Sequence, residues 1–334
     1  MARKVSWGVL GAANIGVEKV IPAMQKGEVS RVDAIASRDL GKAQAAAKSL
    51  GIARAYGSYE ELLADPTIEA IYNPLPNELH TSWTIRALQA GKHVLCEKPI
   101  ALNAEEAHAL VAARAHTGKL VAEAFMVRHH PQWRRARELV VVGAIGELRA
   151  IQSFFSYRLL DADNIRNKQP GGGAFYDIGC YAILTARYVF GAEPTRVVAA
   201  YDLDPKFGTD RLTSALVEFP GGRHLTFTCA TQLPNCQRVT IVGEAGRIEV
   251  PVPFNALIDR PMRIVVDDGA DLVGGGAKVE EFPVCDQYTL QGDAFSRAVL
   301  GEAPLMFPIE DAIANMRVID AAFASARNGR WALI

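Results

Sequence analysis

The feature that most constrains the fold of this chain is a short apolar segment that ends in a turn of small residues. Residues 5–10, Val-Ser-Trp-Gly-Val-Leu, have the composition of a strand buried on both faces, as in a parallel sheet. Gly11, Ala13 and Gly16 follow in the pattern G-x-A-x-x-G, and residues 14–26 have the composition of a helix. Gly11 permits a tight turn, a small residue at position 13 lets a ligand approach the backbone, and Gly16 lets the helix pack closely against the strand.

This turn predicts a binding site for a dinucleotide. The pyrophosphate would lie at the N-terminus of the helix, where free N–H groups and the helix dipole favour an anion. The alternative is an ordinary strand–turn–helix, because alanine at position 13 departs from the strict glycine pattern and the motif alone is weak evidence. The expected cofactor contacts in the turn are Gly11, Ala13, Asn14, Ile15 and Gly16.

The end of the second predicted strand, residues 31–36, indicates which dinucleotide is bound. Enzymes that use NAD usually place an acidic residue about 20 positions beyond the glycine turn, where it binds the ribose 2′-hydroxyl. This chain has Ser37 and Arg38 there, and a hydroxyl with a guanidinium suits a 2′-phosphate. We therefore expect NADP(H) to be preferred over NAD(H). Two alternatives remain: Asp39 binds the 2′-hydroxyl instead of capping a helix at 40–50, or Arg38 is a solvated surface residue.

Up to about residue 125, apolar strands alternate with helices, which predicts a doubly wound parallel α/β sheet, a Rossmann domain. The predicted strands are 5–10, 31–36, 69–73, 93–96 and 120–124, and the predicted helices are 14–26, 39–50, 58–64, 78–90 and 103–117. Such sheets bind ligands at the carboxyl ends of their strands. The expected edge carries Gly11, Ser37, Asn73, Glu97 and Lys98.

Beyond residue 125 the pattern becomes that of an α+β domain. The predicted strands are 147–158, 195–203, 210–219, 223–231, 236–243, 246–250, 262–267 and 278–282, and the predicted helices are 132–142, from the glycines at 171–173 to about 190, 286–300 and 308–328. The hairpin turn at 219–223 indicates a mostly antiparallel sheet. We therefore predict two domains, 1–125 and 126–334, with last helices able to pack back on the first domain.

Charge and composition exclude several other classes of protein. The 36 Lys and Arg residues nearly balance 37 Asp and Glu residues, with no block of one sign, which argues against a nucleic-acid-binding domain. No apolar run reaches the roughly 18 residues of a membrane span. The five cysteines form no C-x-x-C pair and the N-terminus leads directly into a strand, so we expect a cytoplasmic protein with free thiols. The seven histidines lack metal-binding spacing, and we expect no metal site.

Three motifs together resemble the Gfo/Idh/MocA oxidoreductases over nearly the whole chain. They are the glycine-rich segment 8–16, Glu97-Lys98-Pro99, and the segment from Asp177 to Tyr181. The segments 76–80, 123–132 and 171–181 are further similar to dimeric dihydrodiol dehydrogenases and NADP-dependent D-xylose dehydrogenases. Tyrosine at 181 is shared with that branch, whereas many members of the family have histidine. Residues 127–129 depart from the branch, where an aromatic pair often surrounds the arginine.

The resemblance implies a fold and an assembly. In this family a Rossmann domain is followed by an open, largely antiparallel sheet that binds substrate, and one face of this sheet often forms a dimer. We therefore expect residues 126–334 to serve substrate binding and dimerisation, and the protein to be a homodimer or a dimer-based oligomer.

Hydride transfer from an alcohol carbon to nicotinamide needs a base for the hydroxyl proton, and Tyr181 is the candidate. A free tyrosine has a pKa of about 10, which is too high for a base near neutrality. The ammonium of Lys98 would lower that pKa and, in the reverse reaction, stabilise the developing alkoxide. The resemblance implies that folding brings the two residues together. Asp177, one helical turn before Tyr181, is expected to bind substrate hydroxyls or orient Lys98; its alternative role is to complement the helix dipole.

Other candidate site residues follow from the resemblance and from their positions at strand ends. Glu97 is implied to bind the nicotinamide ribose. Asn73, Pro74, Asn77 and His80 are placed to contact the pyrophosphate and ribose, and Asn77 is equally suited to cap a helix. The candidate substrate contacts, besides Tyr181, are Arg128, Arg158 and Asn164, the last in a segment that continues to Arg166.

These observations predict an NADP-dependent oxidoreductase acting on a secondary alcohol or hemiacetal of a small polyol, with an aldopyranose such as D-xylose as the favoured substrate. Two other enzyme activities remain open, a trans-dihydrodiol dehydrogenase and a ketosugar reductase, because all three need the same hydride geometry. Outside catalysis, the alternative is an NADP-sensing regulatory protein built on the same fold.

Overall fold

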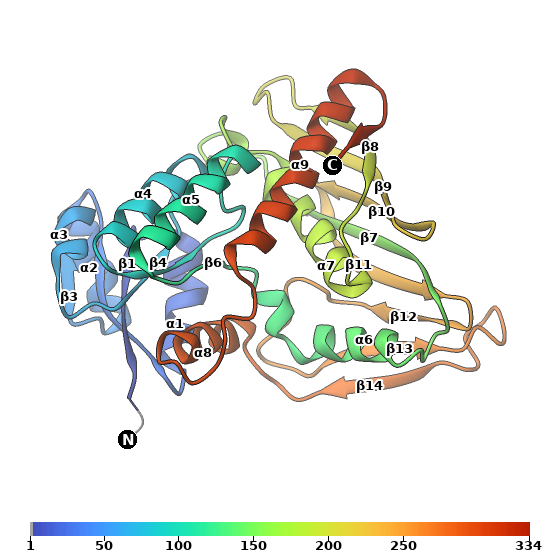
Figure 1. The fold of residues 1–334 in the computed structure, drawn as a ribbon, viewed down its shortest axis with the longest axis horizontal. Helices are drawn as coiled ribbons and strands as arrows, with labels where there is room; N and C mark the ends of the chain where they lie inside the picture. The colour runs from blue at the N-terminus through green and yellow to red at the C-terminus, as the bar shows by residue number, and fades with distance from the viewer. Residues whose placement is uncertain (1–2) are drawn as a thin grey trace. The chain divides into compact units, whose positions relative to one another are not determined.

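The computed structural model describes residues 3–334, which divide into two units (Figure 1). The first unit comprises the chain up to Met126 together with Gln287–Met316. The second unit comprises Val127–Asp286 together with Arg317–Ile334. Each unit is built around one sheet.

The sheet of the first unit is a six-stranded parallel sheet with the order β3-β2-β1-β4-β5-β6. Its strands are β1 (Val5–Leu10), β2 (Ser30–Ala36), β3 (Arg54–Tyr56), β4 (Ala70–Asn73), β5 (His93–Cys96) and β6 (Val121–Glu123). This is the strand order of doubly wound dinucleotide-binding sheets, so the predicted Rossmann fold is confirmed. The sequence prediction missed β3, because its three residues are only half-buried at the sheet edge and form no apolar run.

Helices pack against the strands of this sheet, near β2 as well as near β4 and β5. They are α1 (Ile21–Gln25), α2 (Leu40–Leu50), α3 (Tyr59–Ala64), α4 (Asn77–Gln89), α5 (Ala104–Thr117) and α8 (Gln287–Val299). Figure 1 shows α4 and α5 side by side. The helix predicted at 14–26 runs without a break from Asn14 to Gln25 and includes a π-helical turn, Gly16–Val20; Pro22, which has no N–H, follows directly after this turn.

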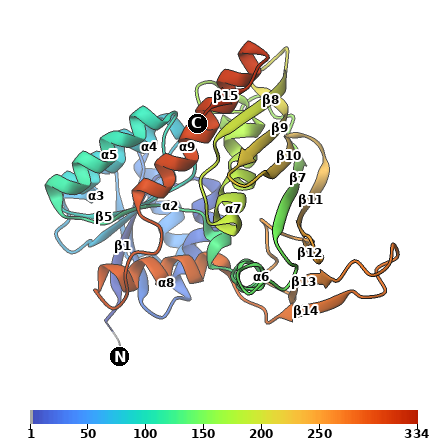
Figure 2. The ribbon, with the colours of Figure 1, turned by 45° about the vertical axis from the view of Figure 1, so that its right-hand side comes forward.

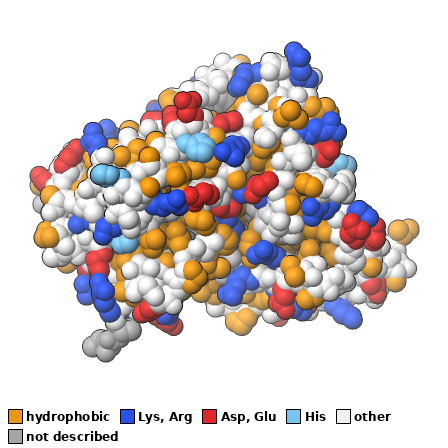
Figure 3. Space-filling view, in the orientation of Figure 1, with side chains coloured by type: hydrophobic (Ala, Val, Ile, Leu, Met, Phe, Trp, Pro, Cys, Tyr) orange, Lys and Arg blue, Asp and Glu red, His pale blue; other side chains and the backbone are white. Residues whose placement is uncertain are grey.

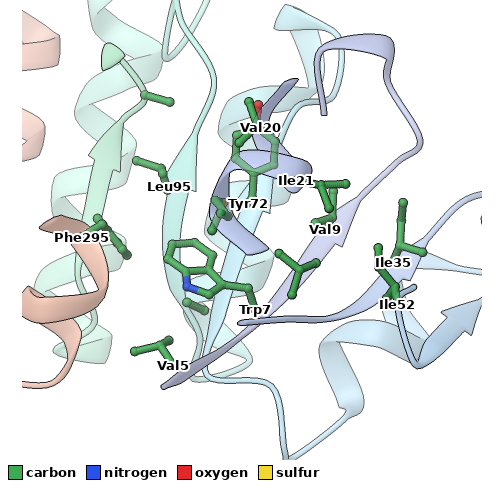
Figure 4. Packing of buried hydrophobic residues seen from close by; sticks show 14 of the residues in the cluster. Val5, Trp7, Val9, Val20, Ile21, Ile35, Ile52, Tyr72, Leu95 and Phe295 are labelled. Atoms are coloured by element: carbon green, nitrogen blue, oxygen red, sulfur yellow. The ribbon is translucent and has the colours of Figure 1, made fainter. Parts of the chain in front are cut away.

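The core of the first unit is centred on Trp7, whose side chain is fully buried (Figure 4). Its ring lies 5.4 Å from that of Phe295 on α8, and its Nε1 donates a hydrogen bond of 3.0 Å to Ser296 Oγ. Ser296 Oγ also lies 3.0 Å from Ser30 Oγ on β2. A helix from the C-terminal part of the chain is thereby fixed to the first two strands.

The sheet of the second unit has nine strands in the order β14-β13-β12-β11-β7-β10-β9-β8-β15. Its strands are β7 (Leu148–Arg158), β8 (Arg196–Leu203), β9 (Asp210–Phe219), β10 (Arg223–Ala230), β11 (Gln232–Gly243), β12 (Gly246–Val250), β13 (Met262–Asp267), β14 (Lys278–Phe282) and β15 (Ala332–Leu333). The pair β7–β10 is parallel and the other described pairs are antiparallel, which confirms the mostly antiparallel prediction.

One face of this sheet is covered by α6 (Pro131–Val141) and α7 (Cys180–Phe190), as Figures 1 and 2 show. A π-helical turn, η4 (Phe175–Gly179), leads directly into α7. Helix α9 (Ile309–Asn328) begins in the first unit, and its second half lies in the second. There Phe323 packs 4.9 Å from the ring of Phe175.

Charged side chains of both signs are interspersed over the face drawn in Figure 3. Among the helices that the structure describes, none is long and apolar enough to cross a membrane.

Candidate active site

The glycine turn after β1 has the backbone geometry that the motif requires. Gly11 has φ +87°, a conformation that favours glycine, and its N–H donates to the carbonyl of Ala36 at the end of β2 (2.7 Å). The carbonyl of Ala13 accepts from Val17 (3.0 Å), so the helix begins beside Asn14. The N–H groups of this first helical turn have no acceptor within the helix, which is the arrangement that binds phosphate.

The three polar residues that follow β2, Ser37, Arg38 and Asp39, have different settings. Asp39 is the N-cap of α2 and accepts from the N–H of Lys42 (3.2 Å), so the capping alternative for this residue is confirmed. Ser37 is buried, and its hydroxyl accepts from the N–H of Asp39 (3.2 Å). Arg38 is exposed.

Arg38 has a neighbour that sequence reasoning missed, Tyr59 at the start of α3. Burial raises the pKa of Tyr59, and the nearby positive charge of Arg38 opposes that rise. A Cβ placed on Gly11 would lie 3.6 Å from the Tyr59 hydroxyl. Arg38 and Tyr59 therefore lie on the same side of the sheet as the glycine turn.

The segment between β4 and α4 is shaped by Asn73, which is fully buried. Its amide donates to the carbonyl of His80 (3.2 Å) and to Thr84 Oγ1 (3.1 Å), and its oxygen accepts from the N–H of Leu75 (3.3 Å). Pro74 lies against the glycine turn, 3.7 Å from a Cβ placed on Gly16. The structure thus places Pro74 beside the expected pyrophosphate position and uses the Asn73 side chain to shape the loop.

Asn77 and His80 differ from the simplest sequence interpretation. Pro76 is the N-cap of α4 and Asn77 is the first helical residue, so the capping alternative for Asn77 is wrong. His80 is 1% exposed, with Nδ1 2.7 Å from the carbonyl of Pro99 and Nε2 2.6 Å from that of Leu75. Burial lowers the pKa of His80 to about 4. Its imidazole therefore joins the β4–α4 segment to Pro99, next to Lys98.

The segment after β5 carries Glu97 and Lys98, both half-buried. Glu97 Oε1 accepts from the Tyr72 hydroxyl (2.7 Å), and Oε2 accepts from the N–H of Lys98 (3.3 Å). The Lys98–Pro99 peptide bond is cis. Beyond it, the buried carboxylate of Glu123 at the end of β6 accepts from the N–H of Ile100 (2.8 Å).

Tyr72 and Glu123 were not among the predicted site residues. Glu123 could have been found, because it is an acidic residue at the end of a predicted apolar strand. Tyr72 reads as an ordinary residue of a buried strand, and its contact with Glu97 requires the folded sheet. Together with His80, these residues fix the backbone on either side of Lys98.

In the second unit, Tyr181 lies at the start of α7 with its ring in an aromatic setting. It is 6% exposed, and its ring centroid lies 5.4 Å from that of Phe254 and 6.0 Å from that of Phe155. Phe254 is itself fully buried, and its N–H donates to Gln237 Oε1 (2.9 Å). The packing leaves the ring of Tyr181 few alternative positions.

Asp177, on η4, is held by two side chains. Its Oδ1 accepts from Arg166 Nε (3.1 Å), and its Oδ2 accepts from the hydroxyl of Tyr157 on β7. Within the second unit the structure thus gathers Asp177, Arg166, Tyr157 and Tyr181 at the start of α7. Tyr157 was not predicted from sequence, since a tyrosine at the end of a strand is common.

The helix start is capped by Asp210 on β9, another residue that the sequence did not indicate. Its Oδ2 accepts from the N–H of Phe175 (2.8 Å) and from Thr213 Oγ1 (2.7 Å), and burial raises the pKa of Asp210 to about 6. Gly173 makes this possible: it has φ +110°, and a Cβ there would lie 2.0 Å from Asp210 Oδ1. The glycine run therefore admits the cap of the helix that carries Asp177 and Tyr181.

The three expected substrate residues have different settings. Arg128 is buried. Burial of the neighbouring His129, together with the charge of Arg128, lowers the pKa of His129 to about 3. Asn164 accepts from the N–H of Arg166 (3.1 Å) and so orders the short 3-10 turn Ile165–Asn167. Arg158 is exposed and follows Tyr157 on β7, so strand alternation directs it to the opposite face. Arg158 is thus not gathered with Asp177 and Tyr181.

The parallel sheet and the glycine turn at the carboxyl end of β1 are those of an NAD(P)-dependent oxidoreductase. A family model described as an oxidoreductase family with an NAD-binding Rossmann fold matches residues 5–125, and a model of the GFO/IDH/MocA C-terminal domain matches residues 133–249. The chain belongs to the Gfo/Idh/MocA oxidoreductase family.

Several known proteins are similar over nearly the whole chain. An uncharacterized oxidoreductase, ORF334 of Rhizobium meliloti, is 50% identical over 328 residues, 98% of each chain. D-xylose 1-dehydrogenase (NADP(+)) 2 of Haloferax volcanii is 40% identical, covering 97% of this chain and 98% of its own. The crystal structure of KijD10, a 3-ketoreductase from Actinomadura kijaniata, in complex with NADP and TDP-benzene is 30% identical with a TM-score of 0.90, covering 97% of this chain and 98% of its own.

Proposed function

We propose that this chain is an NADP-dependent dehydrogenase that oxidises a secondary alcohol or hemiacetal of a small polyol, with an aldopyranose such as D-xylose as its substrate. The observation that carries the proposal is the setting of Lys98 at the carboxyl end of β5, where contacts of His80 and Glu97 fix its backbone in a dinucleotide-binding fold. The relative that is 40% identical over 97% of the chain is a D-xylose dehydrogenase, which supports the substrate class.

The proposed cofactor is NADP(H) in preference to NAD(H). The residues present fit a dinucleotide, because the turn after β1 is tight. Gly11 has φ +87°, and a Cβ there would lie 3.1 Å from the Leu75 side chain, so the turn requires glycine. Arg38 is exposed and lies near Tyr59, where its guanidinium suits a 2′-phosphate. Asp39 supports the same choice, since its carboxylate is used to cap α2.

In the proposed reaction the first 125 residues bind the cofactor and residues 126–334 bind the substrate. A nicotinamide cofactor held by the glycine turn would supply the hydride acceptor for the alcohol carbon. Tyr181 accepts the proton of the substrate hydroxyl, and in the reverse direction it returns that proton. The Lys98 ammonium favours the phenolate of Tyr181 and stabilises negative charge on the substrate oxygen. Asp177 orients the substrate through its hydroxyls.

Reduction of NADP⁺ or NAD⁺, followed by absorbance of the reduced nicotinamide, tests this proposal across a panel of aldopyranoses and a trans-dihydrodiol. We expect reduction of NADP⁺ with an aldopyranose and much slower reduction of NAD⁺. Reduction with the dihydrodiol alone would contradict the sugar substrate. Binding of NADP without reduction by any member of the panel would contradict the dehydrogenase and favour a ketosugar reductase or a sensor.

We further propose that the protein is a homodimer joined through the open face of the nine-stranded sheet. The face away from α6 and α7 has a hollow of about 620 Å³. It is lined by two rungs of paired residues across β8, β9, β10, β7 and β11, namely Val198, Leu216, Thr226, Gln152 and Thr240, and Ala200, Ser214, Thr228, Phe154 and Arg238. Small and apolar side chains dominate this surface, which suits contact with a second copy.

A further inference from the structure

Two side chains, those of Tyr157 and Arg166, hydrogen-bond to Asp177 just before α7. Tyr157 on β7 donates to Asp177 Oδ2, and Arg166 Nε donates to Asp177 Oδ1 (3.1 Å). The Asp177 side chain is 13% exposed and that of Arg166 is 43% exposed. The ion pair is therefore partly shielded from water, and its geometry is fixed from the strand as well as from the 3-10 turn.

The backbone around Arg166 is held in place by the glycine run. The carbonyl of Arg166 accepts from the N–H of Gly173 (2.8 Å), and the carbonyl of Lys168 accepts from that of Gly172 (3.0 Å). A Cβ on Gly172 would lie 2.3 Å from the Lys168 carbonyl oxygen and 2.7 Å from that of Arg166. This close approach brings Arg166 to the helix start, where it meets Asp177.

The ion pair of Arg166 with Asp177 lies within electrostatic range of the phenol of Tyr181, one helical turn after Asp177. The charge of Asp177 makes the largest contribution to raising the pKa of Arg166 above its usual range, and the phenols of Tyr157 and Tyr181 add to the effect. Such an interaction is mutual, so the guanidinium favours the ionised form of Tyr181. Asp177, one helical turn before Tyr181, acts in the opposite sense because a carboxylate disfavours a second negative charge nearby.

We propose that Arg166 is a positioning residue that cancels the charge of Asp177 and thereby allows Tyr181 to ionise. This inference rests on the proposed function, in which Tyr181 exchanges the proton of the substrate hydroxyl. Without Arg166, Asp177 would present an uncompensated negative charge to Tyr181, and the phenol would hold its proton to higher pH. Asp177 can then bind substrate hydroxyls without suppressing the base.

Other titratable groups surround the same helix start. Asp210 on β9 caps η4, and burial raises its pKa to about 6. Cys180 is the first residue of α7, and Cys229 Sγ on β10 would lie 2.9 Å from a Cβ placed on Gly179; burial raises the pKa of Cys229 well above its usual range. Lys98 belongs to the first unit. These groups are unchanged in the variants proposed below, so differences among those variants report on Arg166 and Asp177.

The test is a pH titration of phenolate absorbance in the full chain, with the signal of Tyr181 isolated by subtracting the same variant carrying Tyr181→Phe. We expect Arg166→Gln to move the Tyr181 titration upward by about one pH unit, near the lower end of the range for close charges because water screens the exposed part of Arg166. Arg166→Lys keeps the charge and should move it much less. Lys168→Gln is the matched control, since Lys168 is an exposed cation of the same segment, 3.5 Å from exposed Asp163.

The double variant Arg166→Gln with Asp177→Asn removes both charges and should return the titration to within a few tenths of a pH unit of wild type. Asp177→Asn alone should move it downward, which keeps the inference testable if circular dichroism shows that Arg166→Gln does not fold. An unchanged titration in Arg166→Gln, or a shift that the double variant does not reverse, would overturn the inference.

The same variants separate this inference from the proposed function. The absorbance titration needs no turnover, so it still tests Arg166 if no polyol reduces NADP⁺. In an active enzyme, the acidic limb of the pH profile for polyol oxidation, where the rate rises as the base loses its proton, should move with the titration. Activity in wild type with no movement in Arg166→Gln would overturn the role of Arg166 and leave the dehydrogenase intact.

Discussion

At the scale of single residues, Tyr181 combines an apolar setting for its ring with a charged neighbour for its hydroxyl. Phe155 and Phe254 restrict the ring, while the ion pair of Arg166 with Asp177 lies within electrostatic range of the phenol. Replacement by phenylalanine retains the packing and removes the proton acceptor. We expect Tyr181→Phe to lower turnover by about 10²–10⁴-fold, the usual contribution of a general base, with NADP affinity unchanged.

Turnover with NADP⁺ and the proposed polyol, together with equilibrium binding of NADP, measures this effect. Tyr188→Phe is the matched control, because Tyr188 lies on the same helix with the Arg137 guanidinium 4.7 Å from its ring. That variant should keep turnover within about twofold, as ordinary surface substitutions do. Full activity in Tyr181→Phe would remove the tyrosine from the mechanism.

Cofactor choice is also decided at single residues. Arg38→Ala removes the proposed partner of the 2′-phosphate, and one charged hydrogen bond of about 1.5–3 kcal/mol corresponds to roughly ten- to hundredfold in affinity. We expect that loss for NADP and little change for NAD. Tyr59→Phe, which only loosens Arg38, should give a smaller loss of the same sign. Binding titrations of both dinucleotides measure the effect, with Lys42→Ala as a control for net charge, and an unchanged NADP preference in Arg38→Ala would contradict the assignment.

At the scale of elements, the helix that carries Asp177 and Tyr181 depends on a cap from a distant strand. Asp210 accepts from the N–H of Phe175, and its pKa of about 6 is above the ordinary value of 3.8. The folded protein therefore holds a proton that the unfolded chain releases between these values. The resulting stability is fully present below pH 3.8 and is lost as the pH rises through about 6.

Asp210→Asn resembles the protonated carboxyl and should not show this loss. From pH 4 to pH 7, wild type should lose about 2–3 kcal/mol of unfolding free energy relative to Asp210→Asn. Urea unfolding at both values measures the difference. Asp163→Asn, at a carboxylate whose side chain is 98% exposed, is the control and should follow wild type. Parallel pH dependences for wild type and Asp210→Asn would contradict the buried, raised carboxyl.

The elements show what local sequence can and cannot predict. The alternation of apolar strands and helices predicted the parallel sheet because both faces of each strand are buried, and the period changes at each helix. The parallel pairing of β7 with β10 could not be predicted, since 64 residues of other structure separate Arg158 from Arg223 and the pairing depends on the whole sheet. The same holds for the site: Gly173 was recognised as part of a motif, whereas its partner Asp210 is brought to it only by folding.

At the scale of the whole molecule, the chain leaves the first unit after Met126 and returns to it at Gln287. Trp7 and Ser30, near the start of the chain, contact Ser296 on the returning helix α8, so the first unit is complete only when both segments are present. The second unit likewise closes with β15, which pairs with β8. The N-terminal segment alone therefore lacks part of its own core, although it contains all six strands of its sheet.

The proposed dimer is the prediction that belongs to the whole molecule. Leu216 lies in the middle of the open face of the nine-stranded sheet, paired with Val198 on one side and Thr226 on the other. An arginine there would place a charge in the proposed interface, where desolvating an unpaired charge costs several kcal/mol. We expect light scattering to give twice the chain mass of 36.1 kDa for wild type and a shift toward a single chain for Leu216→Arg. Val141→Arg, at a valine of α6 that is 74% exposed on the covered side of the sheet, should remain dimeric. A wild-type mass of one chain, or a dimer indifferent to Leu216→Arg, would show that this face is not the interface.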